Sequence, residues 1–371
     1  MFGSHLASNL TDHIGPEKII FIRDARAGLE AILVVDNTAA GPAIGGIRMA
    51  TDISLGEVFR LARAMTFKNA AAGLRHGGAK SGIIADPDME DGAKERLVRA
   101  FAHAMRDVTD YIPGPDMGLT EANMAQIQDE IGRVVGLPPV MGGIPLDTLG
   151  ATGFGCAIAT EVAEEMGAVQ IDGSRAVVQG FGAVGIHAAR FLAERGAIIV
   201  GVSDSRGGLI NLNGFDLDKL VQFKQGGQPV REFPNGTAVS GSDLIGLDCD
   251  IWVPAARPDV FTGANAGDVK ASVIVQGANL PATAEAERMF HERGILSIPD
   301  FIANAGGVIC GAVEYAGGSE SQAFAVIEEK IRTNTREVLE RAARDGVEPR
   351  RAAVDMARSR VEEMIGYQRG F

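Results

Sequence analysis

The sequence has little cysteine and no long apolar run. Cys156, Cys249 and Cys310 form no CxxC pair and leave an odd number, which does not suit a disulfide framework and fits a reducing, cytoplasmic compartment. No stretch reaches the roughly 18 apolar residues of a membrane-spanning helix, and a leader with a basic start and an apolar middle is not expected. We therefore expect no membrane partner.

Basic residues and histidines are also scarce. The chain has 35 Lys and Arg against 48 Asp and Glu, which gives a net charge of −13. A nucleic-acid partner is not expected, because phosphate binding requires basic patches. The six histidines show no metal-ligand spacing, so no metal site is expected. A small molecule is the expected partner.

Glycine, in contrast, is abundant. The chain has 48 glycines, and pairs such as 45–46 and 77–78 mark places where backbone approaches backbone or ligand closely. With 371 residues the chain exceeds what one hydrophobic core usually supports, so two domains are expected.

The pattern of predicted elements changes near residue 145. Before it, the sequence predicts two strands within 19–37, and a helix over 54–73 with Ser54 and Glu57 as a capping box. Residues 111–124 are predicted to form a loop that leads into a helix. After residue 145, short apolar strands alternate with helices, which is typical of a parallel sheet covered by helices.

A glycine-rich turn follows the first strand of this second half. The sequence "VVQGFGAVG" contains a G-x-G-x-x-G motif at Gly180, Gly182 and Gly185, between a predicted strand at 175–179 and a predicted helix at 183–194. The motif alone occurs in many glycine-rich turns. Here the strand and helix give it the context of a Rossmann nucleotide site, where the pyrophosphate lies at the helix N-terminus.

An acidic residue ends the next predicted strand. Asp204 is placed to bind ribose hydroxyls and favours NAD, because its charge repels a 2′-phosphate. Arg206 lies two residues later and offers a partner for that phosphate, so NADP stays possible. We expect NAD.

Two lysines stand out in "KNAAAGLRHGGAK", residues 68–80. Lys68 falls on the apolar stripe of the helix over 54–73, whose members are Val58, Leu61, Met65, Lys68 and Ala72. It either extends its ammonium group from the helix edge to solvent or binds an anion such as a carboxylate. Lys80 follows Gly77 and Gly78, and burial would lower its pKa enough for it to act as a base.

Asp116 lies in the loop sequence "GPDMG". Composition alone favours a turn aspartate or a helix cap at this position.

Several segments together resemble the glutamate, leucine, phenylalanine and valine dehydrogenase superfamily. The matching segments, in family order, are "GPAIGGIRM" (41–49), "MTFKNAAAGLRHGGAKSGI" (65–83), "GPDMG" (114–118), "ATGFG" (151–155), "VQGFGAVG" (178–185), "VSDSRGG" (202–208), "QGANLPAT" (276–283) and "PDFIANAGGV" (299–308). The resemblance runs from about residue 18 to the C-terminus. It implies reversible oxidative deamination of an L-amino acid to a 2-oxo acid and ammonia, with NAD or NADP as hydride acceptor.

The resemblance implies an α/β fold with an active-site cleft between two domains. Residues 1–145, completed by C-terminal helices at 336–371, would form the substrate-binding and oligomerisation domain with a mixed sheet. Residues 146–335 would form the Rossmann dinucleotide-binding domain. Family members are homo-oligomers, from dimers to octamers, so self-association is implied too.

The resemblance also assigns roles to individual residues. Lys68 would bind the substrate α-carboxylate with help from the backbone near Gly45 and Gly46, Lys80 would activate water, and Asp116 would transfer protons to and from the substrate nitrogen. Cofactor contacts are implied for Gly180, Phe181, Gly182, Ala183, Val184, Gly185, Asp204, Ser205, Ala255 and Ala256, for Thr152 at the nicotinamide carboxamide, and for Asn279 and Asn304 near the nicotinamide end.

Departures from the family pattern bear on the substrate. Glutamate enzymes resemble "GPxKGG", whereas this chain has Ile44 in place of that lysine, and Gly311 replaces their usual serine. With Met65 and Val308, Ile44 resembles the apolar pocket of the leucine and valine enzymes, so a branched-chain amino acid is expected. Gly311 leaves room for an aromatic or otherwise longer side chain.

Other interpretations stay open. Glutamate is an alternative substrate if another residue, such as Arg75, binds the second carboxylate. Arg75 and His76 are either exposed turn residues or contacts to a polar substrate group. A regulatory nucleotide-binding protein without catalysis is disfavoured, because such a protein needs none of Lys68, Lys80 and Asp116.

Overall fold

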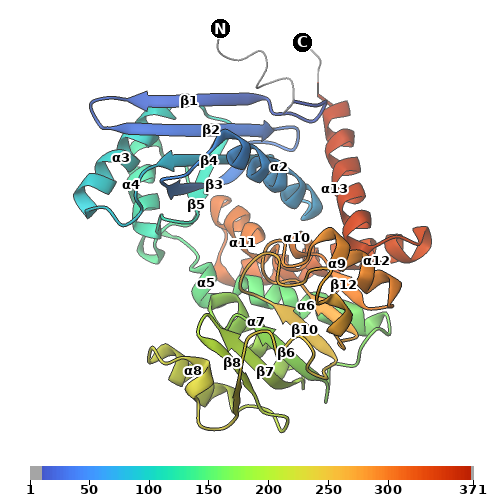
Figure 1. Cartoon of the computed structure of the whole chain (residues 1–371). Helices are drawn as coiled ribbons and strands as arrows, with labels where there is room; N and C mark the ends of the chain where they lie inside the picture. The colour runs from blue at the N-terminus through green and yellow to red at the C-terminus, as the bar shows by residue number, and fades with distance from the viewer. Residues whose placement is uncertain (1–10, 369–371) are drawn as a thin grey trace. The chain divides into compact units, whose positions relative to one another are not determined.

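The computed structural model describes residues 11–368, which divide into two compact units (Figure 1). The first unit runs to Pro145 and adds Val308–Ala323 and the residues from Asp355 onward, and the second contains Leu146–Gly307 and Phe324–Val354. This division differs from the predicted one, which gives 308–335 to the second domain and all of 336–371 to the first. Residues 308–323 join the first unit because their side chains bond there. The Glu314 carboxylate, for example, accepts hydrogen bonds from the backbone of residues 136, 137 and 144.

The first unit is built on a five-stranded mixed sheet. Its strands are β1 (Lys18–Asp24), β2 (Leu29–Asn37), β3 (Ala43–Ala50), β4 (Gly78–Ile84) and β5 (Tyr111–Pro115), in the order β1-β2-β4-β3-β5. The strands β3, β4 and β5 are parallel to one another, while β1 and β2 run antiparallel to their neighbours. Because β3, β4 and β5 are adjacent and parallel, residues from distant sequence segments meet on them.

Helices cover both faces of this sheet. Helices α3 (Asp91–Ala104) and α4 (Glu121–Ile131) bury one face, where Leu33, Ile47 and Phe101 belong to the core. Helix α2 (Leu55–Ala71) packs on the other face, against Val34. Side chains alternate along a strand, so each strand contributes to both faces.

The predicted helix over 54–73 is confirmed, with two differences in detail. Ser54 accepts a hydrogen bond from the Glu57 amide, but the Glu57 side chain bonds Arg48 instead of completing a capping box. The buried stripe is also rotated from the predicted one, because the most deeply buried residues include Ala62, Thr66 and Asn69, whereas Lys68 is only half-buried. Packing against strands β2 and β4 selects that face.

The prediction of a loop at 111–124 is wrong for its first residues. Tyr111–Pro115 forms the edge strand β5, which pairs with β3. A strand with two prolines is tolerated at an edge, because one side of it has no neighbour to receive amide hydrogens.

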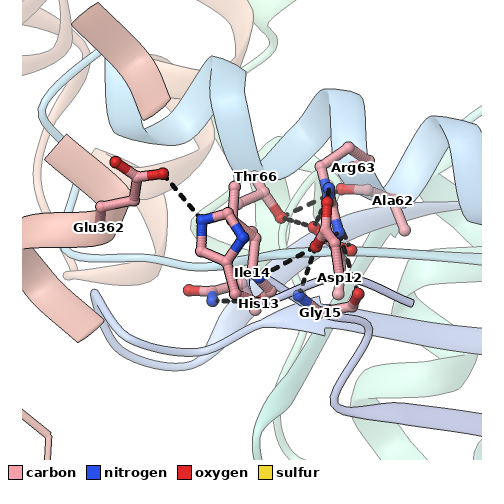
Figure 2. Close-up of polar contacts among 10 residues, drawn as sticks. Asp12, His13, Ile14, Gly15, Ala62, Arg63, Thr66 and Glu362 are labelled. Atoms are coloured by element: carbon pink, nitrogen blue, oxygen red, sulfur yellow. Dashed lines mark hydrogen bonds and ion pairs between the residues drawn. The ribbon is translucent and has the colours of Figure 1, made fainter. Parts of the chain in front are cut away.

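Residues before β1 form hydrogen bonds with α2 and with the C-terminal helix α13 (Pro349–Gly366). Arg63 of α2 donates to both carboxylate oxygens of Asp12, at 2.7 and 2.9 Å, and the two side chains face each other in Figure 2. The same side chain donates to Asp36, which is fully buried in β2. His13 hydrogen-bonds Glu362 of α13 at 2.8 Å (Figure 2).

The second unit is built on a seven-stranded sheet in the order β12-β11-β10-β6-β7-β8-β9. The strands are β6 (Arg175–Gln179), β7 (Ile198–Asp204), β8 (Gly207–Ile210), β9 (Thr237–Val239), β10 (Ile251–Pro254), β11 (Val273–Val275) and β12 (Leu296–Ile298). The five strands from β12 to β7 are parallel, and β8 and β9 add an antiparallel edge. The predicted α/β fold with a Rossmann-type domain is confirmed.

The remaining helices differ widely in length. They are α5 (Leu146–Leu149), α6 (Ala151–Glu165), α7 (Ala183–Ala193), α8 (Leu217–Gln225), α9 (Ala284–Glu292), α10 (Asp300–Ala303), α11 (Gly306–Tyr315) and α12 (Glu320–Asp345), with single 3-10 turns at Pro139–Met141, Val230–Glu232 and Ala266–Asp268. Between residues 11 and 368, none of the helices has the length and apolarity to cross a membrane.

Candidate functional site

The first unit brings Lys80 and Asp116 into direct contact. Lys80 lies on β4, and Asp116 directly follows β5. The Lys80 Nζ atom is 2.6 Å from Asp116 Oδ2, although 36 positions separate the two residues in the sequence. The turn or cap role that composition favours for Asp116 is not what its side chain does here, because the half-buried carboxylate is paired with the buried Lys80 ammonium group.

Gly46 of β3 lies against this pair. A Cβ atom at position 46 would come within 3.0 Å of Lys80 Nζ and 2.9 Å of Asp116 Cβ. At Gly45 a Cβ would lie 1.8 Å from the Ala79 carbonyl oxygen, so a side chain cannot fit between β3 and β4. The glycine pair therefore lets two strands approach and keeps the space over the ion pair open.

Burial and charge shift the pKa of both partners. Only 7% of Lys80 is exposed, and this burial lowers the pKa of its ammonium group, although Asp116 opposes the effect. Burial alone would raise the pKa of Asp116, but the Lys80 and Arg48 cations and their hydrogen bonds hold it below its usual value. The result is a carboxylate that stays ionised beside a lysine that loses its proton more readily than usual.

Arg48, which is not among the predicted site residues, provides a second cation beside Asp116. Its Nε donates to Asp116 Oδ2 at 3.0 Å, and its Nη1 donates to Glu57 Oε1 at 2.7 Å. A signal was available, because residues two apart on a strand share a face and Arg48 lies two positions after Gly46.

Lys68 and Met65 lie on α2, and both are half-buried. They flank the buried stripe of the helix rather than forming part of it. A half-buried lysine at the edge of a helix can pair with an anion without the full cost of burying its charge.

Ile44 is part of a small apolar cluster. It is 5% exposed and packs with Ile112 and Val135, and Ala312 of α11 lies against them. A Cβ at Gly311 would be 3.8 Å from Val135, which is ordinary contact, so a methyl group would fit there. Val308 of the same helix is half-buried.

The two unassigned residues before β4 differ in their environment. Arg75 is exposed, whereas His76 is half-buried and its Nδ1 lies 3.0 Å from the Pro42 carbonyl oxygen. The His76 ring meets Tyr315 edge-on, with 5.8 Å between ring centroids, and burial lowers the pKa of the imidazole.

In the second unit the glycine-rich turn has the geometry of a phosphate loop. Gly180 has φ of +94°, which favours glycine, and a Cβ at Gly185 would lie 2.0 Å from the Gly180 carbonyl oxygen. A Cβ at Gly182 would meet nothing within 4 Å, so the space beside the N-terminus of α7 is open. Ala183 is exposed and Val184 half-buried at this terminus, whereas Phe181 is buried and offers only its backbone.

Residues after neighbouring strands surround this turn. The Ala255 amide donates to the Gln179 carbonyl at 2.7 Å, and a Cβ at Gly180 would lie 2.6 Å from Ala256 Cβ. Asn304 donates to the Asn279 side chain at 3.0 Å. The predicted nucleotide residues from β6, β10, β11 and α10 therefore meet at the carboxyl ends of parallel strands.

Thr152 lies near the start of α6. A Cβ at Gly307 would be 3.4 Å from Thr152 Oγ1, and one at Gly306 would be 2.0 Å from the Ala151 carbonyl oxygen. These glycines allow the segment after Asn304 to approach the N-terminal turn of α6 closely.

Asp204 ends β7 as predicted, but its carboxylate already has three partners. It accepts hydrogen bonds from Lys224 Nζ at 2.5 Å and from the amides of Arg206 and Val230 at 2.8 and 3.1 Å. Burial would raise the pKa of Asp204, yet the bonds to Lys224 and the amides lower it. Ser205 is exposed, and the Arg206 guanidinium donates to the Gly227 carbonyl. A ribose hydroxyl would have to compete for Asp204 with Lys224, which no sequence pattern indicated.

Comparison with known proteins supports the resemblance. Residues 142–369 match the family described as glutamate/leucine/phenylalanine/valine dehydrogenase, and residues 16–133 match its dimerisation domain. An NAD-specific glutamate dehydrogenase of Staphylococcus aureus is 39% identical over 82% of this chain and 76% of its own length.

Two solved structures share the fold over nearly the whole chain. Hetero-hexameric glutamate dehydrogenase from Thermus thermophilus, in its Leu-bound form, is 28% identical with a TM-score of 0.84, and covers 96% of this chain and 91% of its own. L-tryptophan dehydrogenase from Nostoc punctiforme is 27% identical with a TM-score of 0.75, over 95% and 97%. The chain belongs to the glutamate/leucine/phenylalanine/valine dehydrogenase family and is an NAD(P)-dependent amino acid dehydrogenase.

Proposed function

We propose that the protein oxidatively and reversibly deaminates an L-amino acid with an apolar side chain. The observation that carries this proposal is the ion pair between buried Lys80 and half-buried Asp116 beside Gly46. An ionised carboxylate and a lysine with a lowered pKa in contact supply the two proton-transfer groups that amine oxidation and imine hydrolysis require.

The second unit fits a dinucleotide. The open space at Gly182, the close approach of Gly185 and the free N-terminus of α7 suit a pyrophosphate, while Asn279, Asn304 and Thr152 would hold the nicotinamide end. When bound, NAD or NADP supplies the acceptor for the hydride that leaves the substrate Cα.

The residues of the first unit would handle binding and protons. Lys68 would bind the α-carboxylate, and Asp116 would take a proton from the substrate ammonium group, since only the neutral amine supports loss of hydride from Cα. Lys80 would then deprotonate the water that attacks the iminium carbon. Asp116 would return a proton to the nitrogen of the resulting carbinolamine. Its hydroxyl group would lose its proton to solvent as the C–N bond breaks, so that ammonia leaves and the 2-oxo acid remains.

The cluster around Ile44 supports an apolar substrate. Ile44, Ile112, Val135 and Ala312 present hydrocarbon surface, which stabilises an apolar side chain and offers no partner for a second carboxylate. Within this class the open position at Gly311 admits branched-chain or larger, aromatic side chains.

Glutamate is the second candidate substrate. The Staphylococcus aureus relative, at 39% identity, is a glutamate dehydrogenase, and so is the Thermus thermophilus protein. The second carboxylate of glutamate would need a cation, because Ile44 stands in place of the family lysine. Exposed Arg75 is the arginine or lysine nearest to Lys80 in the sequence. The hexameric assembly of the Thermus protein and the dimerisation-domain match support self-association of this chain.

A substrate panel tests the proposal. Purified protein would be assayed for NAD(P)H formation with each coenzyme and with leucine, isoleucine, valine, phenylalanine, tryptophan and glutamate at alkaline pH. We expect turnover of an apolar amino acid, lowered about 10²- to 10⁴-fold in Lys80→Ala because the base is lost. Lys94→Ala, which removes a half-buried lysine of α3 that donates to the Pro87 carbonyl, is the matched control and should retain activity.

The outcomes separate the candidates. Glutamate as the best substrate would overturn the interpretation of Ile44 and leave the reaction class intact. If no amino acid supports NAD(P)H formation while coenzyme binding is measurable, the proposed reaction fails on these substrates.

A further inference from the structure

The Asp116 carboxylate has two cationic partners on the same oxygen. Lys80 Nζ lies 2.6 Å and Arg48 Nε 3.0 Å from Asp116 Oδ2. The side chains of Arg48 and Asp116 are 23% and 28% exposed, so water reaches this part of the pair only partly. Because both cations contact Oδ2, Oδ1 is the oxygen left for a substrate nitrogen.

The fold holds Arg48 from two sides. Its strand β3 lies between β4, which carries Lys80, and β5, which precedes Asp116. The Glu57 carboxylate of α2 accepts from Arg48 Nη1 at 2.7 Å. Glu57 could have bonded the N-terminal backbone of its own helix, but it fixes the guanidinium instead.

The proposed chemistry changes the charge of Lys80 but not of Arg48. When Lys80 is neutral and acts as a base, Asp116 loses one of its two cationic partners. A partly buried carboxylate without a partner is costly, and it would take up a proton more easily. The guanidinium stays protonated throughout, and the carboxylates of Asp116 and Glu57 raise its pKa further, although burial opposes them.

We propose that Arg48 is a positioning residue, which keeps the Asp116 carboxylate ionised and in place while Lys80 is deprotonated. Arg48 itself need not touch the substrate. This inference rests on the proposed function, because it assigns Arg48 a role in the proton transfers suggested for Lys80 and Asp116.

The direction of the effect follows from the charges around the pair. Lys80 faces Asp116, Arg48 of β3 and Glu57 of α2, and Asp116 faces Lys80 and Arg48, with the Tyr111 hydroxyl of β5 nearby. Arg48 lowers the pKa of Lys80 by repulsion and that of Asp116 by attraction. Removing its charge therefore raises both pKa values, and the rise of activity with pH should move to higher pH.

The test is the pH dependence of kcat/KM for oxidative deamination. In Arg48→Gln we expect the rising limb of the pH profile to move to higher pH by about one unit. At pH values below the midpoint of this limb, kcat/KM should therefore fall about tenfold. Arg48→Lys keeps the charge and should leave the limb near its wild-type position, even if the rate falls. The KM for NAD(P) should not change, because the nucleotide residues belong to the other unit.

Controls separate this effect from misfolding. Arg99→Gln removes a guanidinium that bonds Glu95, Asp129 and Glu130 on α3 and α4, which cover the opposite face of the sheet, and should leave the profile unchanged. If Arg48→Gln fails to bind NADH or melts early, Arg48→Met provides a second neutral variant.

The possible failures are distinct. An active wild-type enzyme whose pH profile is the same in Arg48→Gln would overturn the role of Arg48. Equal limb shifts in Arg48→Gln and Arg48→Lys would also overturn it, because charge would not be the cause. A wild-type enzyme with no amino-acid-dependent NAD(P)H formation would instead refute the proposed function.

Discussion

Neighbouring side chains change the role that the sequence predicts for Asp204. An acid at this position of a nucleotide-binding strand is expected to bind ribose and to repel a 2′-phosphate. Here Lys224 of α8 neutralises it at 2.5 Å, and only 6% of the Asp204 side chain is exposed. The repulsion that would exclude NADP is therefore weakened.

Replacing Lys224 should sharpen coenzyme selection. In Lys224→Met the Asp204 charge is unopposed, so we expect the ratio of kcat/KM for NAD to that for NADP to rise about tenfold. Steady-state kinetics with both coenzymes measures this ratio. Lys219→Met on the same helix, which removes an exposed pair with Asp216, should leave it unchanged. A fall in the ratio would mean that Asp204 does not face the ribose end of the coenzyme.

At the scale of elements, the first turn of α13 forms hydrogen bonds with two of the segments that resemble the family, 276–283 and 299–308. Arg350 donates to Glu287 Oε1 at 3.0 Å, to Gln276 Oε1 at 2.7 Å and to Asp300 Oδ1 at 2.8 Å. The other oxygen of Asp300 accepts from the Leu280 amide, and Leu280 has an unfavourable φ of +48°. Arg350 thus helps hold the turn that carries Asn279.

Loss of Arg350 should destabilise the second unit. Glu287 and Asp300 have side chains only 4% and 6% exposed, so Arg350→Met removes the cation that pairs with two buried carboxylates, at a cost of about 3–5 kcal/mol. We expect the melting temperature to fall by roughly 10 °C, measured by calorimetry. Arg358→Met replaces an exposed arginine of the same helix and should change stability by less than about 0.5 kcal/mol. Equal effects of the two variants would contradict this account.

For the whole molecule, acid stability depends on carboxylates whose pKa is lowered by folding. The hydrogen bond from Arg63 is the largest cause that lowers the pKa of Asp12 from 3.8 to about 2. A group with a lowered folded pKa stabilises the protein above its unfolded pKa, and this stability is lost as the pH falls towards the folded value. The window for Asp12 is therefore between about pH 4 and pH 2.

Asp12→Asn tests this contribution. Because the Asp12 side chain is 46% exposed, solvent reduces the stabilisation to about 1 kcal/mol. We expect the variant to melt a few degrees lower at neutral pH and to lose less stability than wild type between about pH 4 and pH 2. Asp52→Asn, at an exposed position, is the control. Parallel melting curves of Asp12→Asn and wild type across this range would refute the assignment.

Features that depend on local pattern were predictable from the sequence alone. The glycine spacing of 180–185, the strand before it and the acid after the next strand predicted the nucleotide-binding half, because these features follow one another within a single βαβ unit. The lysine pair at 68 and 80, with a family resemblance over most of the chain, predicted the reaction class.

The contacts between side chains that are distant in sequence depend on the packing of strands and helices. Asp116 reaches Lys80 because β4, β3 and β5 are adjacent and parallel, and a sequence pattern does not specify strand order. For the same reason the sequence did not predict the roles of Arg48, Lys224 and Arg350. Their partners lie 9 to 74 positions away and are determined by packing. Periodicity located the helix over 54–73, but burial against the sheet decided which of its faces points inward.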